Sequence, residues 1–257
     1  MADLNNIEHK STRPVVITIC SGKGGVGKSI LAANLAYAIS KRNKTVLLWD
    51  ANINFPNQHL LLGVEPPVRL SDVYSGRVKI ENAYFQFSPT LFLLADIPGG
   101  SALSQVNQDV SEVIDPLLNN NRFDYIIIDT PAAISPEILQ YCQISDIINI
   151  VITDEPTSLL DAYGLLKILL QYFDPEKMKL LVNNVIDGED ADEITHKLNL
   201  ATEKFLKIHL EVFGIIPYDR AVRQSIMQQE LFMITNPLSD VAKAVDKAAD
   251  SIILNFI

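Results

Sequence analysis

Seven short apolar segments recur along the chain and limit the folds open to it. Each has the length of a β-strand and is rich in Ile, Val and Leu; together they span residues 15–20, 45–50, 91–95, 125–129, 146–153, 178–184 and 212–217. Most are apolar at nearly every position rather than at alternate positions, which is typical of strands covered on both faces. The pattern predicts strands buried inside a sheet.

Helical stretches lie between these segments, with apolar residues three and four positions apart. The clearest are "KSILAANLAYAISKR" (28–42), "SLLDAYGLLKILLQYF" (158–173) and "EITHKLNLATEKFLKIHL" (193–210). Buried strands that alternate with amphipathic helices predict an α/β fold with a doubly wound, mostly parallel sheet and helices on both faces. At 257 residues, without repeats or linkers, we expect one domain over 1–257, preceded by a flexible arm at 1–14.

The charge balance bears on the class of partner. The formal net charge is −10 and the sequence pI is about 4.8. Contacts with nucleic-acid phosphates need clustered Lys and Arg, so this balance argues against a protein that coats DNA, although a small basic patch remains compatible with it.

Cysteine and histidine usage argues against a metal centre built from these residues. The two cysteines form no C-x-x-C pair and the four histidines are scattered singly; they are Cys20, Cys142, His9, His59, His196 and His209. A reduced, cytoplasmic setting fits this usage. The first 14 residues contain no apolar core typical of a signal peptide, and no apolar run reaches the roughly 20 residues of a membrane-spanning helix.

A glycine-rich stretch, "GKGGVGKS", follows the first expected strand and begins the first expected helix. It fits the pattern G-x-x-x-x-G-K-[ST] from Gly22 to Ser29. In this context backbone N–H groups and the helix N-terminus face phosphate oxygens, Lys28 neutralises them, and the Ser29 hydroxyl binds Mg²⁺. The alternative is a glycine turn without a ligand, and the strand–loop–helix context favours the phosphate loop.

A phosphate-binding loop of this pattern does not require Lys23, which taken alone is interpreted as a solvent-exposed loop lysine. The string "KGGVGKS", however, resembles the deviant Walker A motif of the MinD/ParA family of P-loop ATPases. This resemblance implies ATP and Mg²⁺ as cofactors and an ATP-dependent homodimer in which Lys23 reaches the phosphates bound by the partner subunit. It also implies that the nucleotide contacts Gly22, Lys23, Gly24, Gly25, Val26, Gly27, Lys28, Ser29 and Ile30.

Asp129 ends the apolar run "YIIID" and is followed by "TPAA". A carboxylate at the C-terminal end of a buried strand lies where such folds bind ligands, so we expect Asp129 to hold Mg²⁺ through water, together with Ser29. The alternative is an ordinary strand-end aspartate. "DTPAA" resembles the family's switch II stretch, D-[ST]-x-A-G, with Ala133 in place of the glycine; because alanine resists positive φ, this switch would move less freely.

Asp50 ends another expected strand, and "DAN" (50–52) occupies the place of the family's second acidic motif, D-x-D. In that family the second carboxylate positions the attacking water. Asn52 stands there instead, and an amide can orient water but cannot take its proton. The resemblance thus makes Lys23, Lys28, Asp50 and Asn52 the catalytic residues and predicts slow hydrolysis. Natural divergence and an engineered change both remain open as the origin of Asn52.

By the same resemblance, adenine recognition falls to Asn183 in "LLVNN" and to the loop "IPYD" (216–219), through Pro217, Tyr218 and Asp219. Taken alone, Asn183 reads as an ordinary turn residue at a strand end.

The segment "EPTSLLDAYGLLK" (155–167) resembles the flagellar-number regulators FlhG, FleN and YlxH within this family. Further similarity covers 201–206, 213–230 and 236–245, so the resemblance extends over nearly the whole chain after residue 15. It implies an ATP-driven dimerisation switch that controls the number or placement of a cell-surface machine, the flagellum. The implied partners are an SRP-type GTPase similar to FlhF or flagellar basal-body proteins. As local structure, the segment is a helix start that Thr157 or Ser158 caps.

Two stretches depart from that branch. The arm before Val15 lacks the "DQA" motif that relatives use to activate the GTPase, and the loop after Asp50 reads "ANINFPNQHLLLG" rather than a glycine-containing "LGLAN" pattern.

The C-terminal stretch 237–257 has one apolar helical face, formed by Leu238, Val241, Val245, Ala248, Ile252 and Phe256. A lipid-binding helix has a polar face rich in Lys and Arg. Here two lysines are offset by three aspartates, so we expect a core helix, with peripheral attachment at the inner membrane or cell pole as the alternative.

Three rival functions follow from the same residues. Asn52 and Ala133 favour an ATP-holding dimeric scaffold with little turnover. A partitioning ATPase that coats DNA conflicts with the acidic charge, and an iron–sulfur carrier of the same P-loop group would need a cysteine pair that is missing.

Overall fold

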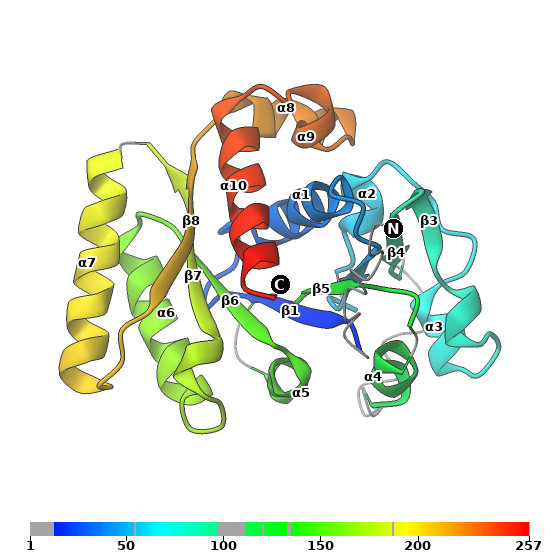
Figure 1. Cartoon of the computed structure of the whole chain (residues 1–257), viewed down its shortest axis with the longest axis horizontal. Helices are drawn as coiled ribbons and strands as arrows, with labels where there is room; N and C mark the ends of the chain where they lie inside the picture. The colour runs from blue at the N-terminus through cyan, green and yellow to red at the C-terminus, as the bar shows by residue number, and fades with distance from the viewer. Residues whose placement is uncertain are drawn as a thin grey trace, which may run out of the picture.

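The computed structural model describes residues 13–53, 55–96, 111–119, 121–132, 135–186 and 188–256. Within these ranges one eight-stranded sheet runs in the order β3-β4-β2-β5-β1-β6-β7-β8 (Figure 1). Every neighbouring pair is parallel except β3 and β4. The expected doubly wound α/β fold is confirmed. That the chain is a single domain stays a prediction, and the arm at 1–14 lies outside the described residues up to residue 12.

All seven expected strands are present. The strands are β1 Val15–Cys20, β2 Val46–Asp50, β3 Phe85–Ser88, β4 Leu91–Leu94, β5 Tyr125–Asp129, β6 Ile147–Ile152, β7 Met178–Val185 and β8 Glu211–Pro217. The sequence pattern did not predict β3. This strand lies at the edge of the sheet, pairs with β4 in an irregular register and buries none of its residues fully, so it lacks a continuous apolar run.

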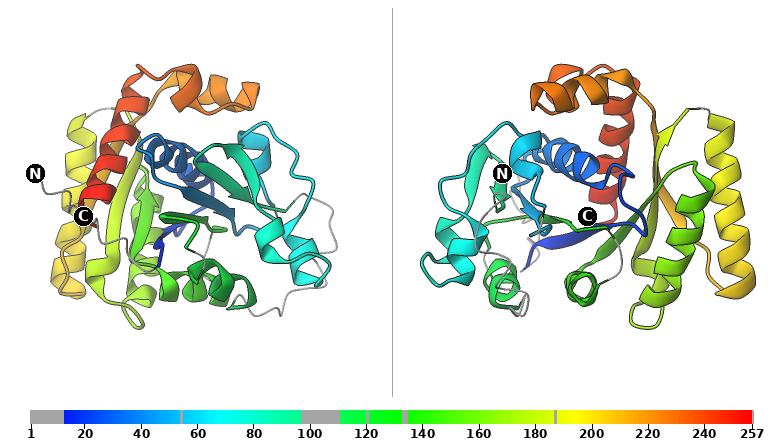
Figure 2. Two further views of the ribbon diagram at one scale, coloured as in Figure 1. Left: turned by 45° about the vertical axis from the view of Figure 1, so that its right-hand side comes forward. Right: turned by 180° about the vertical axis from the view of Figure 1, so that it is seen from behind.

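Helices cover both faces of the sheet (Figures 1 and 2). Apolar residues of α1 and α10 pack on one face, and those of α3 to α7 pack on the other. The helices are α1 Lys28–Ser40, α2 Gln58–Leu61, α3 Leu70–Tyr74, α4 Ser111–Leu118, α5 Pro136–Ile144, α6 Pro156–Leu169, α7 Gly188–Phe205, α8 Arg220–Gln228, α9 Phe232–Thr235 and α10 Asp240–Leu254, with short 3₁₀ turns at Ile80–Asn82 and Pro175–Lys177.

Helix α7 begins and ends earlier than the stretch 193–210 predicted. The left-handed backbone of Lys207 (φ 62°) is incompatible with a continuing right-handed helix. The side chain of Asn199 then fixes the segment that follows, because its amide bonds both the N–H and the C=O of Leu210, at 2.9 and 3.1 Å.

Helix α6 begins differently from the prediction. Glu155 is the N-cap residue, Pro156 occupies the first turn, and no side chain caps the helix, so the expected cap by Thr157 or Ser158 is wrong. The Ser158 hydroxyl instead accepts a hydrogen bond from the N–H of Thr153 at 3.0 Å. The helix start therefore leaves Glu155 and Thr157 available for other contacts.

Most residues of the predicted apolar face of α10 are buried, as expected of a core helix. Its face residues Val241, Val245, Ala248 and Ile252 are buried against α1 and β8, whereas Leu238 and Phe256, outside the helix bounds, are 83 % and 42 % exposed.

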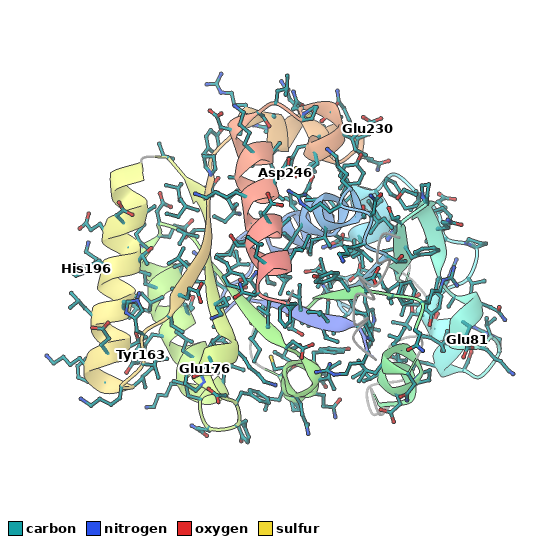
Figure 3. All side chains as sticks on the ribbon, viewed as in Figure 1. Glu81, Tyr163, Glu176, His196, Glu230 and Asp246 are labelled. Carbon is teal, nitrogen blue, oxygen red and sulfur yellow. The ribbon has the colours of Figure 1, made fainter. Side chains whose placement is uncertain are left out.

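Arg42, just after α1, fixes the polar side of α10. Its guanidinium lies 3.0 Å from Asp246, labelled in Figure 3, and 2.5 Å from Asp250. Two of the three aspartates that offset the lysines thus have a role within the fold. In the part of the chain that the structure describes, no helix is both long and apolar enough to cross a membrane.

Candidate nucleotide-binding site

The candidate site lies where the C-terminal ends of β1, β2 and β5 meet. Asp50 and Asp129 are partners across β2 and β5, and Ile19 of β1 pairs with Asp129 from the other side. The glycine-rich loop continues directly from β1 into α1. Because ligands of doubly wound sheets bind at the carboxyl ends of the strands, this edge is the expected position for a site.

Glycine is required at two positions of the loop by contacts with other segments. A Cβ on Gly22 would lie 2.3 Å from the backbone oxygen of Asp161 in α6, and one on Gly27 would lie 2.3 Å from Nδ2 of Asn183. Gly27 also has a left-handed φ of 92° immediately before α1. No side chain caps α1 and its first turn carries no acidic residue, so the free N–H groups of this helix end suit an anion such as a phosphate.

Lys28 points into the loop from the first turn of α1. It is 7 % exposed, and its Nζ donates a hydrogen bond to Ser21 Oγ at 2.8 Å. Burial lowers the pKa of Lys28, while the charge of Asp129 acts in the opposite direction. A cation held at this depth has few protein partners, and an anion in the loop would stabilise it.

Ser29 and Asp129 fit a hard divalent cation. Asp129 is fully buried; its Oδ2 accepts a hydrogen bond from Gln58 Nε2 at 2.7 Å, and its Oδ1 has no hydrogen-bond partner among the described residues. Burial raises the pKa of Asp129, while the nearby Ser29 hydroxyl, the Gln58 amide and the charge of Lys28 act in the opposite direction. An unpaired buried carboxylate oxygen beside a serine hydroxyl is the kind of oxygen donor set that Mg²⁺ uses.

Asp50 organises the loop that follows β2. One carboxylate oxygen accepts the N–H of Asn52 at 3.1 Å, and the other accepts the N–H groups of Asn57 and Gln58 at 2.7 and 2.9 Å. Burial and the neighbouring Asp129 raise the pKa of Asp50 to about 8, although these three hydrogen bonds favour the charged form. The contacts give Asp50 a structural role, and its direct catalytic role stays a prediction.

Asn52 belongs to the same loop and is half-buried. Its Oδ1 accepts a hydrogen bond from the N–H of Phe55 at 3.3 Å. The side chain is thus held by an acceptor atom that aspartate would also provide. Its role toward an attacking water stays a prediction, and Ala133 of the second switch lies outside the described residues.

The side chain of Lys23 contacts the start of α6 and not the interior of the glycine-rich loop. Its Nζ forms an ion pair with Glu155 and donates to Thr157 Oγ1 at 3.0 Å. The side chain is 35 % exposed. The two lysines of the motif therefore have different surroundings, since Lys28 is buried inside the loop and Lys23 lies at its outer surface.

The residues expected at the adenine lie at the ends of β7 and β8. The Asn183 amide contacts the loop directly, because Nδ2 donates to the backbone oxygen of Val26 at 2.8 Å. Pro217 ends the neighbouring strand, and Tyr218, 54 % exposed, donates its N–H to Val185 at 2.8 Å. Asp219 caps α8 through the N–H of Ala221. The structure brings these segments to the loop, and their contact with adenine stays a prediction.

Several residues of the site were not found by sequence reasoning. These are Ser21, Asn57, Gln58 and, as the partner of Lys23, Glu155. Gln58 precedes the apolar run "HLLLG", and nothing in the spacing there distinguishes it from a surface residue.

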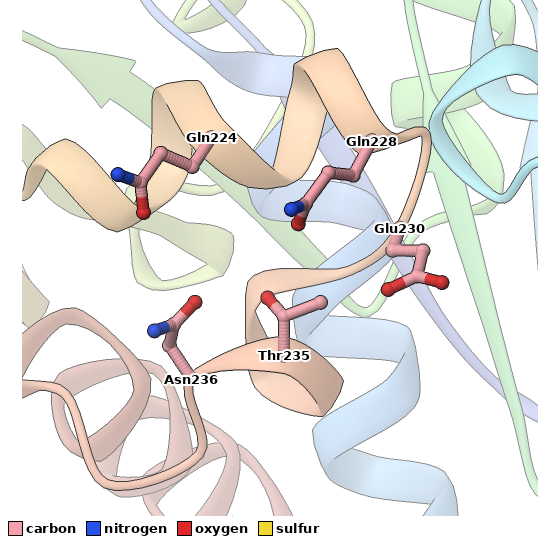
Figure 4. A pocket seen from close by; sticks show the side chains of 5 residues that line it. All are labelled: Gln224, Gln228, Glu230, Thr235 and Asn236. Carbon is pink, nitrogen blue, oxygen red and sulfur yellow. The ribbon is translucent and has the colours of Figure 1, made fainter.

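A separate polar hollow of about 650 Å³ lies between α8 and α9 (Figure 4). It is lined by Gln224, Gln228, Glu230, Thr235 and Asn236. This lining offers no Lys or Arg to neutralise phosphates, so we assign the nucleotide site to the glycine-rich loop.

The parallel sheet, the loop entering α1 and the buried Lys28 and Asp129 define a P-loop nucleotide-binding protein. Over residues 17–232 the chain matches the CobQ/CobB/MinD/ParA nucleotide binding domain, and it belongs to this family. Proteins of the MinD/ParA group are ATPases.

The relatives include a flagellum site-determining protein and septum site-determining proteins. The chain is 30 % identical to the antiactivator FleN of Pseudomonas aeruginosa, covering 94 % of this chain and 88 % of FleN. It is 26 % identical to the flagellum site-determining protein YlxH of Helicobacter pylori, over 91 % of this chain and 80 % of YlxH. Among solved structures, the septum site-determining protein MinD of Pyrococcus horikoshii, complexed with Mg-ADP, matches with a TM-score of 0.77 and 23 % identity over 93 % of this chain and 96 % of that one. The predicted resemblance to the MinD/ParA family and its FleN and YlxH members is confirmed.

Proposed function

We propose that this protein is an ATP-dependent dimerisation switch that regulates the number or placement of the flagellum. The observation that carries the proposal is the separation of the two lysines. Lys28 lies inside the loop with Ser29 and Asp129, the residues proposed to bind the phosphates and the cation, whereas Lys23 lies outside this group. YlxH is, by its name, a flagellum site-determining protein, and this supports the flagellum as the machine that is regulated.

Each residue has a role in this proposal. Mg·ATP would supply the phosphoanhydride that is cleaved; Lys28 neutralises the phosphate oxygens, and Ser29 and Asp129 hold the cation. Lys23 leaves Glu155 and completes the site of the partner subunit. Asn52 orients the attacking water without taking its proton, so turnover is slow.

The partners and location of this switch are part of the proposal. Besides the homodimer, the partners are an SRP-type GTPase similar to FlhF or basal-body proteins. The location is the cytoplasm, with peripheral attachment at the inner membrane or cell pole as the alternative. Cells lacking the gene should assemble an altered number of flagella, and an unchanged number and position would contradict the flagellar role.

A second candidate function is an ATP-bound dimeric scaffold with little turnover. Asn52 in place of a carboxylate favours it. A DNA-coating ATPase is disfavoured by the net charge of −10.

Two lysine variants test the site and the trans role together. Calorimetry with Mg·ATP should show that Lys28→Ala abolishes binding, because it removes the charge facing the phosphates. Lys23→Ala should bind nucleotide with unchanged affinity and remain monomeric in light scattering where the parent protein dimerises. Unchanged affinity in Lys28→Ala would refute the site, and a normal ATP dimer of Lys23→Ala would remove the trans role.

A further inference from the structure

We propose that Gln58, assisted by Asn57, forms the outer coordination sphere of the cation site, accepting hydrogen bonds from water molecules bound to a divalent cation at Ser29 and Asp129. This inference rests on the proposed binding of Mg·nucleotide and adds two positioning residues to it.

The amide nitrogens of both residues are already committed to the ligands. Gln58, the first residue of α2, is fully buried, and its Nε2 donates to Asp129 Oδ2 at 2.7 Å and to the backbone oxygen of Ser29 at 3.0 Å. Asn57 Nδ2 lies 3.2 Å from Ser29 Oγ. Gln58 faces two acceptors, which fixes its amide orientation: a flipped amide would place oxygen against oxygen.

Three buried oxygens of Asn57, Gln58 and Asp129 lack hydrogen-bond donors in the part of the chain that the structure describes. Gln58 Oε1, Asn57 Oδ1 and Asp129 Oδ1 are all buried without a hydrogen-bond partner among the described residues. Buried polar atoms are normally paired. Three unpaired acceptors on Asp129, on Gln58 that bonds it and on the adjacent Asn57 indicate a missing source of donors. Mg²⁺ keeps several water ligands when it binds through one or two protein groups, and each such water donates hydrogen bonds.

The fold does not need these two side chains to shape the loop. Asp50 holds the backbone N–H groups of both Asn57 and Gln58, at 2.7 and 2.9 Å, independently of their amides. Removing the Gln58 amide should therefore leave the loop in place while weakening the cation site.

Gln58→Leu tests the inference because leucine keeps a similar volume without the amide. MgCl₂ is titrated against the protein with a fluorescent ADP analogue, which excludes turnover. We expect the Mg²⁺ concentration for half-maximal enhancement of nucleotide binding to rise at least about tenfold, the usual cost of losing an outer-shell partner. Binding of the analogue in EDTA should be unchanged. Asn57→Ala should shift the Mg²⁺ requirement in the same direction by a smaller factor.

Asn199→Leu is the matched control. Asn199 is also a buried amide, but it bonds only the backbone of Leu210 near the far end of α7. This variant should lose stability while keeping the Mg²⁺ requirement of the parent protein.

The outcomes separate this inference from the proposed function. If the parent binds no nucleotide, the proposed function fails. If the parent needs Mg²⁺ and Gln58→Leu needs no more of it, or loses binding equally in EDTA, the inference fails. Should Gln58→Leu not fold, Gln58→Met replaces it: methionine is unbranched and also lacks the amide, so its Mg²⁺ requirement should rise in the same way. An unchanged Mg²⁺ requirement in this variant would also overturn the inference.

Discussion

The ammonium group of Lys23 is paired with the carboxylate of Glu155, a residue 132 positions later in the chain. The ion pair lowers the pKa of Glu155, and Thr157 provides a second oxygen to the same ammonium group at 3.0 Å. In the proposed switch, Lys23 must leave these contacts before it can reach the partner subunit. The ion pair would therefore oppose ATP-dependent dimerisation.

Replacing Glu155 by Gln should strengthen ATP-dependent dimerisation. The change removes the charge that retains Lys23 and keeps a side chain of similar size. Both partners are exposed enough for solvent to screen them, so we expect the dimer dissociation constant to fall about two- to fivefold at low salt, with the difference disappearing in roughly 1 M salt. Light scattering over a range of protein concentrations measures it.

Glu211→Gln is the matched control for this prediction. Glu211 pairs with Lys179 at 2.6 Å and is 59 % exposed, the same fraction as Glu155, but it lies on β8 away from the loop. Equal effects of the two variants on dimerisation would show that only the change in net charge matters.

Replacing Asn52 by Asp should raise the rate of ATP hydrolysis at least about tenfold. A carboxylate can draw off the proton that an amide cannot, and such assistance contributes roughly 10²- to 10⁴-fold, with the lower end applying where the group mainly orients water. Aspartate retains the acceptor that bonds the N–H of Phe55, so the loop should keep its shape. Phosphate release from the two proteins, measured side by side, checks the rate.

The lifetime of the ATP dimer should shorten in the same Asn52→Asp variant, because hydrolysis ends it. If the parent hydrolyses ATP as fast as the variant, another residue positions the water, and the scaffold function loses its support.

Stability without Mg²⁺ should fall as the pH rises from about 4 to about 8. The pKa of Asp50 is raised from 3.8 to about 8 in the folded protein, so the folded state holds a proton that the unfolded state has lost. The contribution of Asp50 to the free energy of unfolding is fully present below its pKa in the unfolded state and is lost as the pH rises through its pKa in the folded state. The free energy of unfolding falls over this interval by at most about 1.4 kcal/mol per pH unit.

Urea unfolding of the parent and of Asp50→Asn, compared pH by pH, isolates this contribution. The variant keeps one acceptor oxygen for the loop and cannot titrate, so the difference between the two curves should change over that interval and level off above it. A constant difference would show that Asp50 is charged throughout. Saturating MgCl₂ should weaken the dependence, because a bound cation favours the charged carboxylates.

The phosphate loop could be predicted from sequence because its chemistry is contiguous. The loop is one continuous segment in which β1 is followed by the glycines, by Lys28 and Ser29 and by α1. The groups expected to contact the phosphates therefore all lie within one short stretch of sequence. The buried strands could also be predicted from local sequence, because a strand covered on both faces needs apolar residues at nearly every position. Predicting β3 would have required a pattern that a short, half-exposed edge strand does not carry.

Local sequence patterns are sufficient to predict every described strand except β3, the phosphate loop and the carboxylates that end β2 and β5. Which side chains meet around these carboxylates depends on how the strands are ordered and packed in the folded chain. Because β1 lies between β5 and β6, the loop after β1 meets both Asp129 and the start of α6, which places Glu155 against Lys23. The loop after β2 crosses the same edge and buries Gln58 beside Asp129. Such contacts join residues far apart in the chain, and their geometry follows from strand order and packing, which no local pattern specifies.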